Sequence, residues 1–165
     1  MTTTVPTLRP IPFDLAEDAR ITAVDSLNAW LVDLIALGLR LKQSHWNLRG
    51  TRFQSVHEQL DEILVDVRNA TDDIAERVVT LGAAADGRPS IVAKHMTLKD
   101  FPSGQLTVEQ AIRASCGDLG GVIQHGRTCL EAVGRADPIS EDLVISVLSA
   151  LEKHHWMLDA QRDEI

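Results

Sequence analysis

Apolar residues recur at the spacing of an α-helix twice in the first half of the chain. Between residues 21 and 45 they form one stripe, and between residues 53 and 81 they form a second stripe that ends at Gly82. Apolar positions three or four residues apart fall on one face of a helix. Only residues 47–52 separate the two stripes, so the pattern predicts two long antiparallel helices joined by a turn.

Two more helices are predicted after a long connection. Residues 83–106 contain glycine and proline with only short apolar clusters, and a connection of this length must cross part of the fold. Thr107 opens a helix that runs to Val133, because a glutamine three positions later completes a helix-start signal. After a short link, Ser140 is the predicted N-cap of a last helix that runs to Ala160.

The lengths of these links predict the topology. Short links make the first and second helices antiparallel, and likewise the third and fourth, whereas the long connection lets the second and third run the same way. This is an all-α four-helix bundle with one crossover, the ferritin-like arrangement. We expect residues 21–165 to form this single domain and residues 1–20 to form an extended tail.

Composition narrows the range of partners and compartments. The net charge of -8 attracts cations and repels the phosphates of nucleic acid at long range. Residues 1–13 hold no continuous apolar run, which argues against a signal peptide or a membrane span. Cys116 and Cys129 lie roughly 20 Å apart along one predicted helix, too far for a disulfide. We therefore expect reduced thiols and a cytoplasmic protein.

The second predicted helix carries two pairs of metal-binding side chains. His57 and Asp61 are four residues apart, as are Asp72 and Glu76, and each such pair points its side chains the same way. At about 100° per residue, all four positions share one face of the helix. Carboxylate and imidazole ligands together suit iron, manganese or zinc. The alternative is that these are ordinary surface charges of an amphipathic helix.

One helix cannot bring both pairs to one metal ion. Asp61 and Asp72 are roughly 16 Å apart along the axis, whereas a ligand lies within about 2.5 Å of its metal. Two antiparallel copies of the helix, related by a two-fold axis near Asp66 and Val67, would place one pair opposite the partner's other pair. The spacing therefore predicts a dimer with two equivalent sites.

A histidine of the first helix joins this predicted site. His45 and His57 are equally far from the centre of the turn near Thr51. Across an antiparallel helix pair they should lie side by side.

These residues resemble the signature of the Dps family. The resemblance lies in HWNLRGTRFQSVHEQLDEIL over residues 45–64 and DDIAERVVTLG over residues 72–82. Lys42 and the segment LEKHHWMLDA over residues 151–160 extend the resemblance over nearly the whole bundle. It implies a dodecameric shell with ferroxidase centres at its two-fold interfaces, whose iron ligands are His45, His57, Asp61, Asp72 and Glu76.

The resemblance also implies a reaction. Fe(II) would be oxidised by hydrogen peroxide, or more slowly by oxygen, and a ferric mineral would be stored in the cavity, which protects DNA from oxidative damage. Trp46 would lie near the centre, either as a sink for stray radicals or as a packing residue. Asp137 and Asp142 would line a three-fold pore, with favourable placement at the start of a helix as the alternative for Asp142.

Two other functions stay open at this stage. Some Dps proteins bind nucleoid DNA through lysine-rich tails, but residues 1–20 contain only Arg9 and Arg20 as cations. DNA contacts would instead need arginines such as Arg49 or Arg52. A metal-dependent hydrolase could use the same ligands to activate water, and the spacing does not distinguish it from a ferroxidase.

Overall fold

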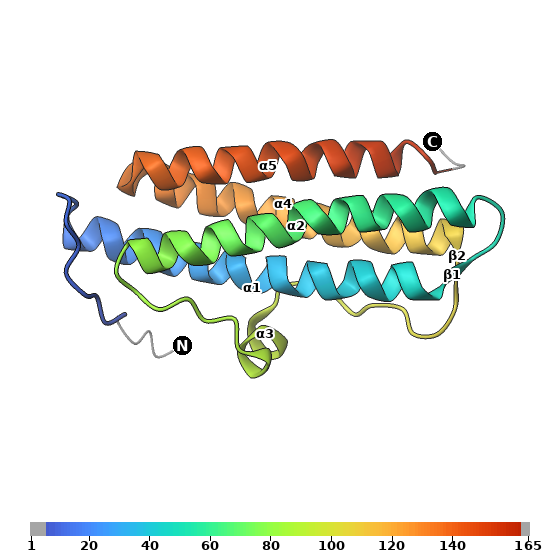
Figure 1. The fold of residues 1–165 in the computed structure, drawn as a ribbon, viewed down its shortest axis with the longest axis horizontal. Helices are drawn as coiled ribbons and strands as arrows, with labels where there is room; N and C mark the ends of the chain where they lie inside the picture. Colours follow the sequence, from blue (N-terminus) through green and yellow to red (C-terminus); the bar gives the residue numbers. More distant parts are fainter. Residues whose placement is uncertain (1–5, 163–165) are drawn as a thin grey trace.

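The computed structural model describes residues 6–162, most of which lie in four long helices packed as a bundle (Figure 1). Residues 1–5 of the predicted tail and residues 163–165 of the predicted domain lie outside this range. The long helices are α1 (Glu17–Asn47), α2 (Phe53–Thr80), α4 (Val108–Ala136) and α5 (Pro138–Asp159). This confirms the predicted four-helix bundle with a long second connection.

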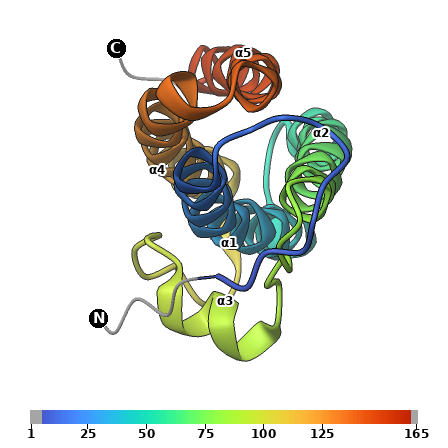
Figure 2. The ribbon, with the colours of Figure 1, turned by 90° about the vertical axis from the view of Figure 1, so that its left-hand side faces the viewer.

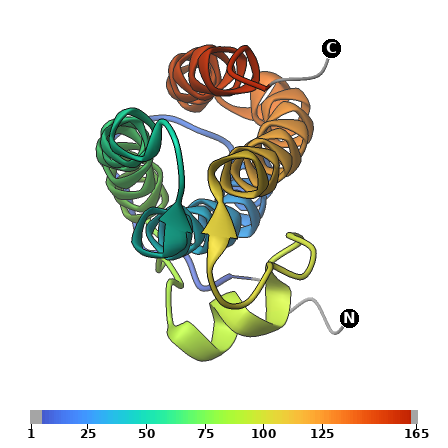
Figure 3. The same cartoon turned by 90° about the vertical axis from the view of Figure 1, so that its right-hand side faces the viewer.

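The crossover contains structure of its own. It holds the short helix α3 (Pro89–His95), which packs against α1 outside the bundle (Figure 2). The two-residue strand β1 (Leu48–Arg49) after α1 pairs in parallel with β2 (Leu106–Thr107) at the end of the crossover (Figure 3). This pair ties both connections together at one end of the bundle.

Three helix boundaries differ from the predicted ones. α1 begins at Glu17, four residues before the expected start. α4 continues through Gly134, where a Cβ would lie only 2.9 Å from the Glu141 carboxylate. The prediction of Ser140 as an N-cap is wrong, because Asp137 caps α5 and accepts a hydrogen bond from the Ser140 backbone N–H at 3.1 Å.

The core is continuous along the bundle and includes Trp30. Its ring is fully buried, its Nε1 donates to the Val122 carbonyl at 3.0 Å, and a Cβ at Gly126 would lie 2.6 Å from the ring. Trp30 is therefore an anchor of the core. Cys116 and Cys129 are buried free thiols, and burial raises the pKa of each to about 12.

α1 contains an apolar stretch of 18 residues. It is the one helix in residues 6–162 that is long and apolar enough to suit a membrane span, with a mean hydropathy of 1.4. Of the residues in this apolar stretch of α1, 56% are buried inside the bundle. α1 therefore has the burial expected of a core helix.

The segment before α1 is attached to the end of α2 (Figure 2). The Arg9 backbone N–H donates to the Gly82 carbonyl at 2.8 Å, and its guanidinium donates to the Val79 carbonyl at 2.7 Å. Arg20 donates twice to the Leu81 carbonyl. Both cations thus lie at the negative end of the α2 dipole, where positive charge is stabilising.

Candidate metal centre

The two predicted histidines lie face to face between α1 and α2. The rings of His45 and His57 stack with their centroids 3.6 Å apart and their planes 20° apart. His45 is almost fully buried, and the ring of Phe53 on α2 lies with its centroid 4.9 Å from that of His57. The turn between the helices therefore brings together the two residues that the sequence predicted to be neighbours.

Reciprocal hydrogen bonds orient both rings. The Nδ1 atom of His45 lies 3.0 Å from the His57 carbonyl oxygen, and the Nδ1 atom of His57 lies 3.0 Å from the His45 carbonyl oxygen. A carbonyl oxygen can only accept, so each Nδ1 carries the proton. In the neutral rings Nε2 then keeps its lone pair, which is the state in which imidazole binds a metal.

Asp61 lies beside this pair as an ionised carboxylate. Its Oδ1 accepts a hydrogen bond from Lys42 Nζ at 2.7 Å and lies 3.3 Å from His45 Nδ1. The Lys42 hydrogen bond, with smaller effects of His45 and His57, holds the pKa of Asp61 below its ordinary value. With 47% of its side chain exposed, Asp61 is accessible to a cation from solution.

The function of Lys42 could not be assigned from the spacing alone. Lys42 precedes His45 by three residues and therefore shares its helix face. That spacing is the signal that links it to the site. The structure adds that its partner is Asp61.

Asp72 and Glu76 lie further along α2, and both are exposed. They follow Asp61 by eleven and fifteen residues on one continuous helix (Figure 1). At about 1.5 Å per residue, Asp72 lies roughly 16 Å from Asp61 along the axis. A single subunit therefore does not bring the two pairs together.

Within residues 6–162, the structure contains no group of three or more His, Cys, Asp or Glu side chains placed to hold a metal ion. One subunit presents two partial sets of ligands on one face of α2. Either set needs further ligands from elsewhere to surround a metal.

Exposed apolar side chains also lie on α1 and α2, the two helices that carry the predicted ligands. Leu39 and Trp46 on α1 are 67% and 68% exposed, and Val65 on α2 is 57% exposed. Trp46 is thus not packed in the core of the subunit. Trp156 on α5 is also exposed, at 67%, and is not a core residue either.

The two predicted pore residues have different environments. Asp137 is buried, accepts hydrogen bonds from Ser140 and forms an ion pair with Arg77 at 2.5 Å. Its carboxylate does not face solvent, so the structure assigns it to capping rather than to a pore. Asp142 is exposed and lies beyond the first turn of α5, where the helix dipole has less effect.

Three other histidines lie outside the predicted site. His125 Nδ1 pairs with the buried Asp33 carboxylate at 2.7 Å, and His154 Nε2 pairs with Asp66 at 2.7 Å. His155 lies near Gly120 on α4. None of the three belongs to the His45–His57 cluster.

Comparison with known protein families agrees with the fold. A model of the ferritin-like domain matches residues 24–165. The DNA protection during starvation protein of Agrobacterium fabrum is 35% identical, over 92% of this chain and 94% of its own length.

Solved structures show the same similarity. DpsA14 of Streptomyces coelicolor superimposes with a TM-score of 0.91 and 31% identity, over 95% of this chain and 94% of its own. Dps of Microbacterium arborescens in the high iron form gives a TM-score of 0.85 at 27% identity, over 92% of this chain and 97% of its own.

Proposed function

Because this chain belongs to the Dps family of ferritin-like proteins, we propose that it oxidises Fe(II) at centres shared between subunits and stores the ferric product. Membership supports iron storage and DNA protection at the level of the family. The oxidant is hydrogen peroxide, or more slowly oxygen. The assembly is a dodecameric shell.

The observation that carries this proposal is the fixed histidine pair beside Asp61. Both Nδ1 protons are held on backbone carbonyls, so both rings are prepared to bind through Nε2. Asp61 adds a carboxylate that is already ionised. Hard oxygen and imidazole ligands of this kind suit ferrous iron.

The missing ligands come from a second copy of α2. Positions 57 and 76, and positions 61 and 72, are equally far from a point between Asp66 and Val67. A two-fold axis at that point brings His57 and Asp61 of one subunit opposite Asp72 and Glu76 of the partner subunit. Val65 follows Asp61 by four residues and so shares its face of α2, and it is an exposed apolar side chain that the same contact would cover, which favours a dimer on this face.

The reaction requires two ferrous ions per peroxide. Each Fe(II) gives one electron, the peroxide O–O bond breaks, and two protons complete two molecules of water. A centre that holds two ferrous ions side by side delivers both electrons together and avoids release of hydroxyl radical. The residues named above bind the iron substrate and hold it in this arrangement.

We further propose that the chain protects DNA by consuming iron and peroxide rather than by condensing DNA. Arg9 and Arg20 are the only cations in the first twenty residues, and both are bound to the carbonyl end of α2. The buried reduced thiols of Cys116 and Cys129 support a cytoplasmic location.

Mixed assembly of two defective variants tests the shared site. One variant carries His57→Ala and Asp61→Ala, the other carries Asp72→Ala and Glu76→Ala, and each alone should form inactive shells. Mixed dimers should regain one of their two sites. We therefore expect peroxide-dependent Fe(II) oxidation to return when the variants are refolded together, measured as formation of a ferric core that elutes with the protein.

The control is Asp73→Ala, which removes an exposed acid of α2 outside the ligand set and should leave oxidation unchanged. If mixed shells were as inactive as the separate variants, the shared site would be wrong. A hydrolase would retain no ferric core in any of these samples.

A further inference from the structure

The crossover and α4 enclose a cleft that is separate from the proposed iron centre. Its volume is about 670 Å³, within the range of pockets that bind small molecules. The apolar part of its lining comes from the crossover residues Leu98, Phe101 and Pro102 and from Ala114, Gly117 and Gly121 of α4.

Two glycines of α4, Gly117 and Gly121, leave helix backbone uncovered on one side of the cleft. A Cβ at Gly117 would meet no atom within 4 Å, so the helix backbone itself faces open space. At Gly121 a Cβ would lie 3.3 Å from Leu98 Cδ2. A planar ring fits a surface of this shape, with Phe101 beside it.

A buried carboxylate lines the cleft with unused capacity to accept hydrogen bonds. Asp118 is 7% exposed, and its Oδ1 accepts from Arg40 Nη1 at 2.8 Å. Its Oδ2 has no hydrogen-bond partner among residues 6–162 and is shielded from solvent. Burial raises the pKa of Asp118 above its ordinary value, so a further donor would stabilise the charged form.

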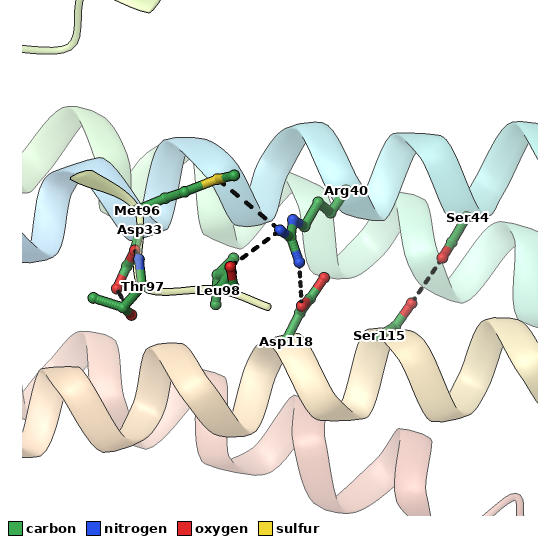
Figure 4. A network of polar contacts seen from close by, with 8 residues as sticks. All are labelled: Asp33, Arg40, Ser44, Met96, Thr97, Leu98, Ser115 and Asp118. Atoms are coloured by element: carbon green, nitrogen blue, oxygen red, sulfur yellow. Dashed lines mark hydrogen bonds and ion pairs between the residues drawn. The ribbon is translucent and has the colours of Figure 1, made fainter. Parts of the chain in front are cut away.

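Arg40 is already engaged on several sides (Figure 4). Its Nη2 lies 3.4 Å from the Leu98 carbonyl oxygen and 4.0 Å from Met96 Sδ, and the guanidinium lies over the Phe101 ring at 5.6 Å. With the Arg40 guanidinium engaged in this way, Asp118 Oδ2 is the atom of this ion pair that keeps unused capacity for a hydrogen bond.

The rim carries no excess of one charge. Lys99 is followed by Asp100, and Arg113 pairs with Glu109 at 2.8 Å. Neither a strong anion nor a strong cation is selected by such a rim.

We propose that this cleft binds a small phenol-like molecule, with its ring against Gly117 and Phe101 and its hydroxyl donating to the Asp118 carboxylate. Because Oδ2 is covered in the structure, binding of the hydroxyl requires displacement of the atoms that cover this oxygen. This site is independent of the iron chemistry, since none of its residues belongs to the proposed centre.

Calorimetry with 4-ethylphenol and the assembled protein tests the proposal. We expect a dissociation constant on the order of 1 mM or tighter. The ether 4-ethylanisole has the same ring but no donor and should bind about tenfold more weakly. Asp118→Asn should remove most of this preference, because the amide is a weaker acceptor than the carboxylate.

A second variant blocks the cleft without touching the Asp118–Arg40 pair. Gly117→Leu projects a side chain into the open space and should abolish binding of 4-ethylphenol, with iron oxidation unchanged. Gly120→Ala on the same helix lies outside the cleft lining and serves as the control. The proposal is overturned if the assembled wild type does not bind the phenol, if phenol and ether bind equally, or if Gly117→Leu binds normally.

Discussion

At the scale of single residues, the start of α5 decides the role of Asp137. Asp137 has the acidic side chain expected of a pore, yet it caps α5 and pairs with Arg77 of α2. Burial acts to raise the pKa of Asp137, but hydrogen bonds from Ser140 and Arg77 outweigh it and hold the pKa below its ordinary value of 3.8. The carboxylate therefore stabilises the folded protein while it is ionised.

Asp137→Asn should reveal that contribution. Asparagine keeps an N-cap acceptor but leaves the partly buried Arg77 without this charged partner, so we expect a loss of about 2 kcal/mol at pH 7. A carboxylate with a lowered pKa stabilises above its unfolded pKa, and the effect is lost as pH falls through the folded pKa. The difference from wild type in thermal unfolding should therefore shrink below about pH 4.

The matched control is Asp142→Asn, which changes an exposed aspartate five residues along the same helix. It should leave the unfolding temperature nearly unchanged. Equal stability of Asp137→Asn and wild type at pH 7 would contradict the capping role.

The proposed iron ligands show how much of the site could be predicted from the sequence at the scale of residues. The neighbouring positions of His45 and His57 follow from the turn between α1 and α2, and the structure places them together. Their reciprocal bonds to backbone carbonyls could not be predicted, because they depend on the rotation of each helix about its axis. Whether Asp72 and Glu76 face these ligands across a dimer stays a prediction.

At the scale of elements, apolar periodicity predicted the four long helices but not every boundary. α5 begins at Pro138 rather than at Ser140 because proline suits the first turn and Asp137 can cap it. Gly134 would ordinarily end a helix, but α4 continues through it. The Glu141 side chain of α5 occupies the space that a Cβ at Gly134 would take. The spacing of apolar residues along the sequence does not reveal such contacts between α4 and α5.

The crossover was predicted only as a connection. α3 is seven residues long, and its Val92 is buried against Val32 and Ala36 of α1. A helix this short has too few apolar positions to show a period. The β1–β2 pair is shorter still, with two residues in each strand, and forms only because the bundle brings both ends together.

Asp33 of α1 fastens this crossover to the bundle. The carboxylate is fully buried and accepts from the Thr97 backbone N–H at 2.7 Å, from Thr97 Oγ1 at 2.6 Å and from His125. Burial acts to raise the pKa of Asp33, but these hydrogen bonds outweigh it and hold the pKa below its ordinary value. One ionised side chain thus joins α1, α4 and the segment that follows α3.

Thr97→Val tests this attachment. The change keeps the side-chain shape and removes one donor to a buried carboxylate, so we expect a loss of about 1 to 2 kcal/mol. Hydrogen exchange of residues 96–101 should become faster, while exchange in the middle of α2 stays slow. Thr128→Val is the control, because that hydroxyl bonds only within α4 on an exposed surface. Unchanged exchange in residues 96–101 would show that Asp33 does not hold the crossover.

At the scale of the whole molecule, exposed apolar side chains favour association between copies, and the net negative charge attracts cations. The chain carries a net charge of -8, and the α1–α2 face combines exposed apolar side chains with the proposed iron ligands. A closed shell needs openings for iron, and carboxylates around an opening attract cations. Of the two predicted pore residues, Asp142 is exposed and Asp137 is buried, so Asp142 is the one that we propose for that role.

Asp142→Asn therefore tests the proposed pore. The change keeps the size of the side chain and removes one charge per subunit, or three at a three-fold opening. If Asp142 lines the pore, growth of the ferric core should slow several-fold at low salt, and the difference should diminish as salt screens the charges. Equilibrium binding of Fe(II) at the two-fold centres should stay intact, because Asp142 is not among their ligands. Asp14→Asn removes an exposed charge before α1 and should leave core growth unchanged. An Asp142→Asn shell that mineralises at the wild-type rate in low salt would return this aspartate to an ordinary surface role.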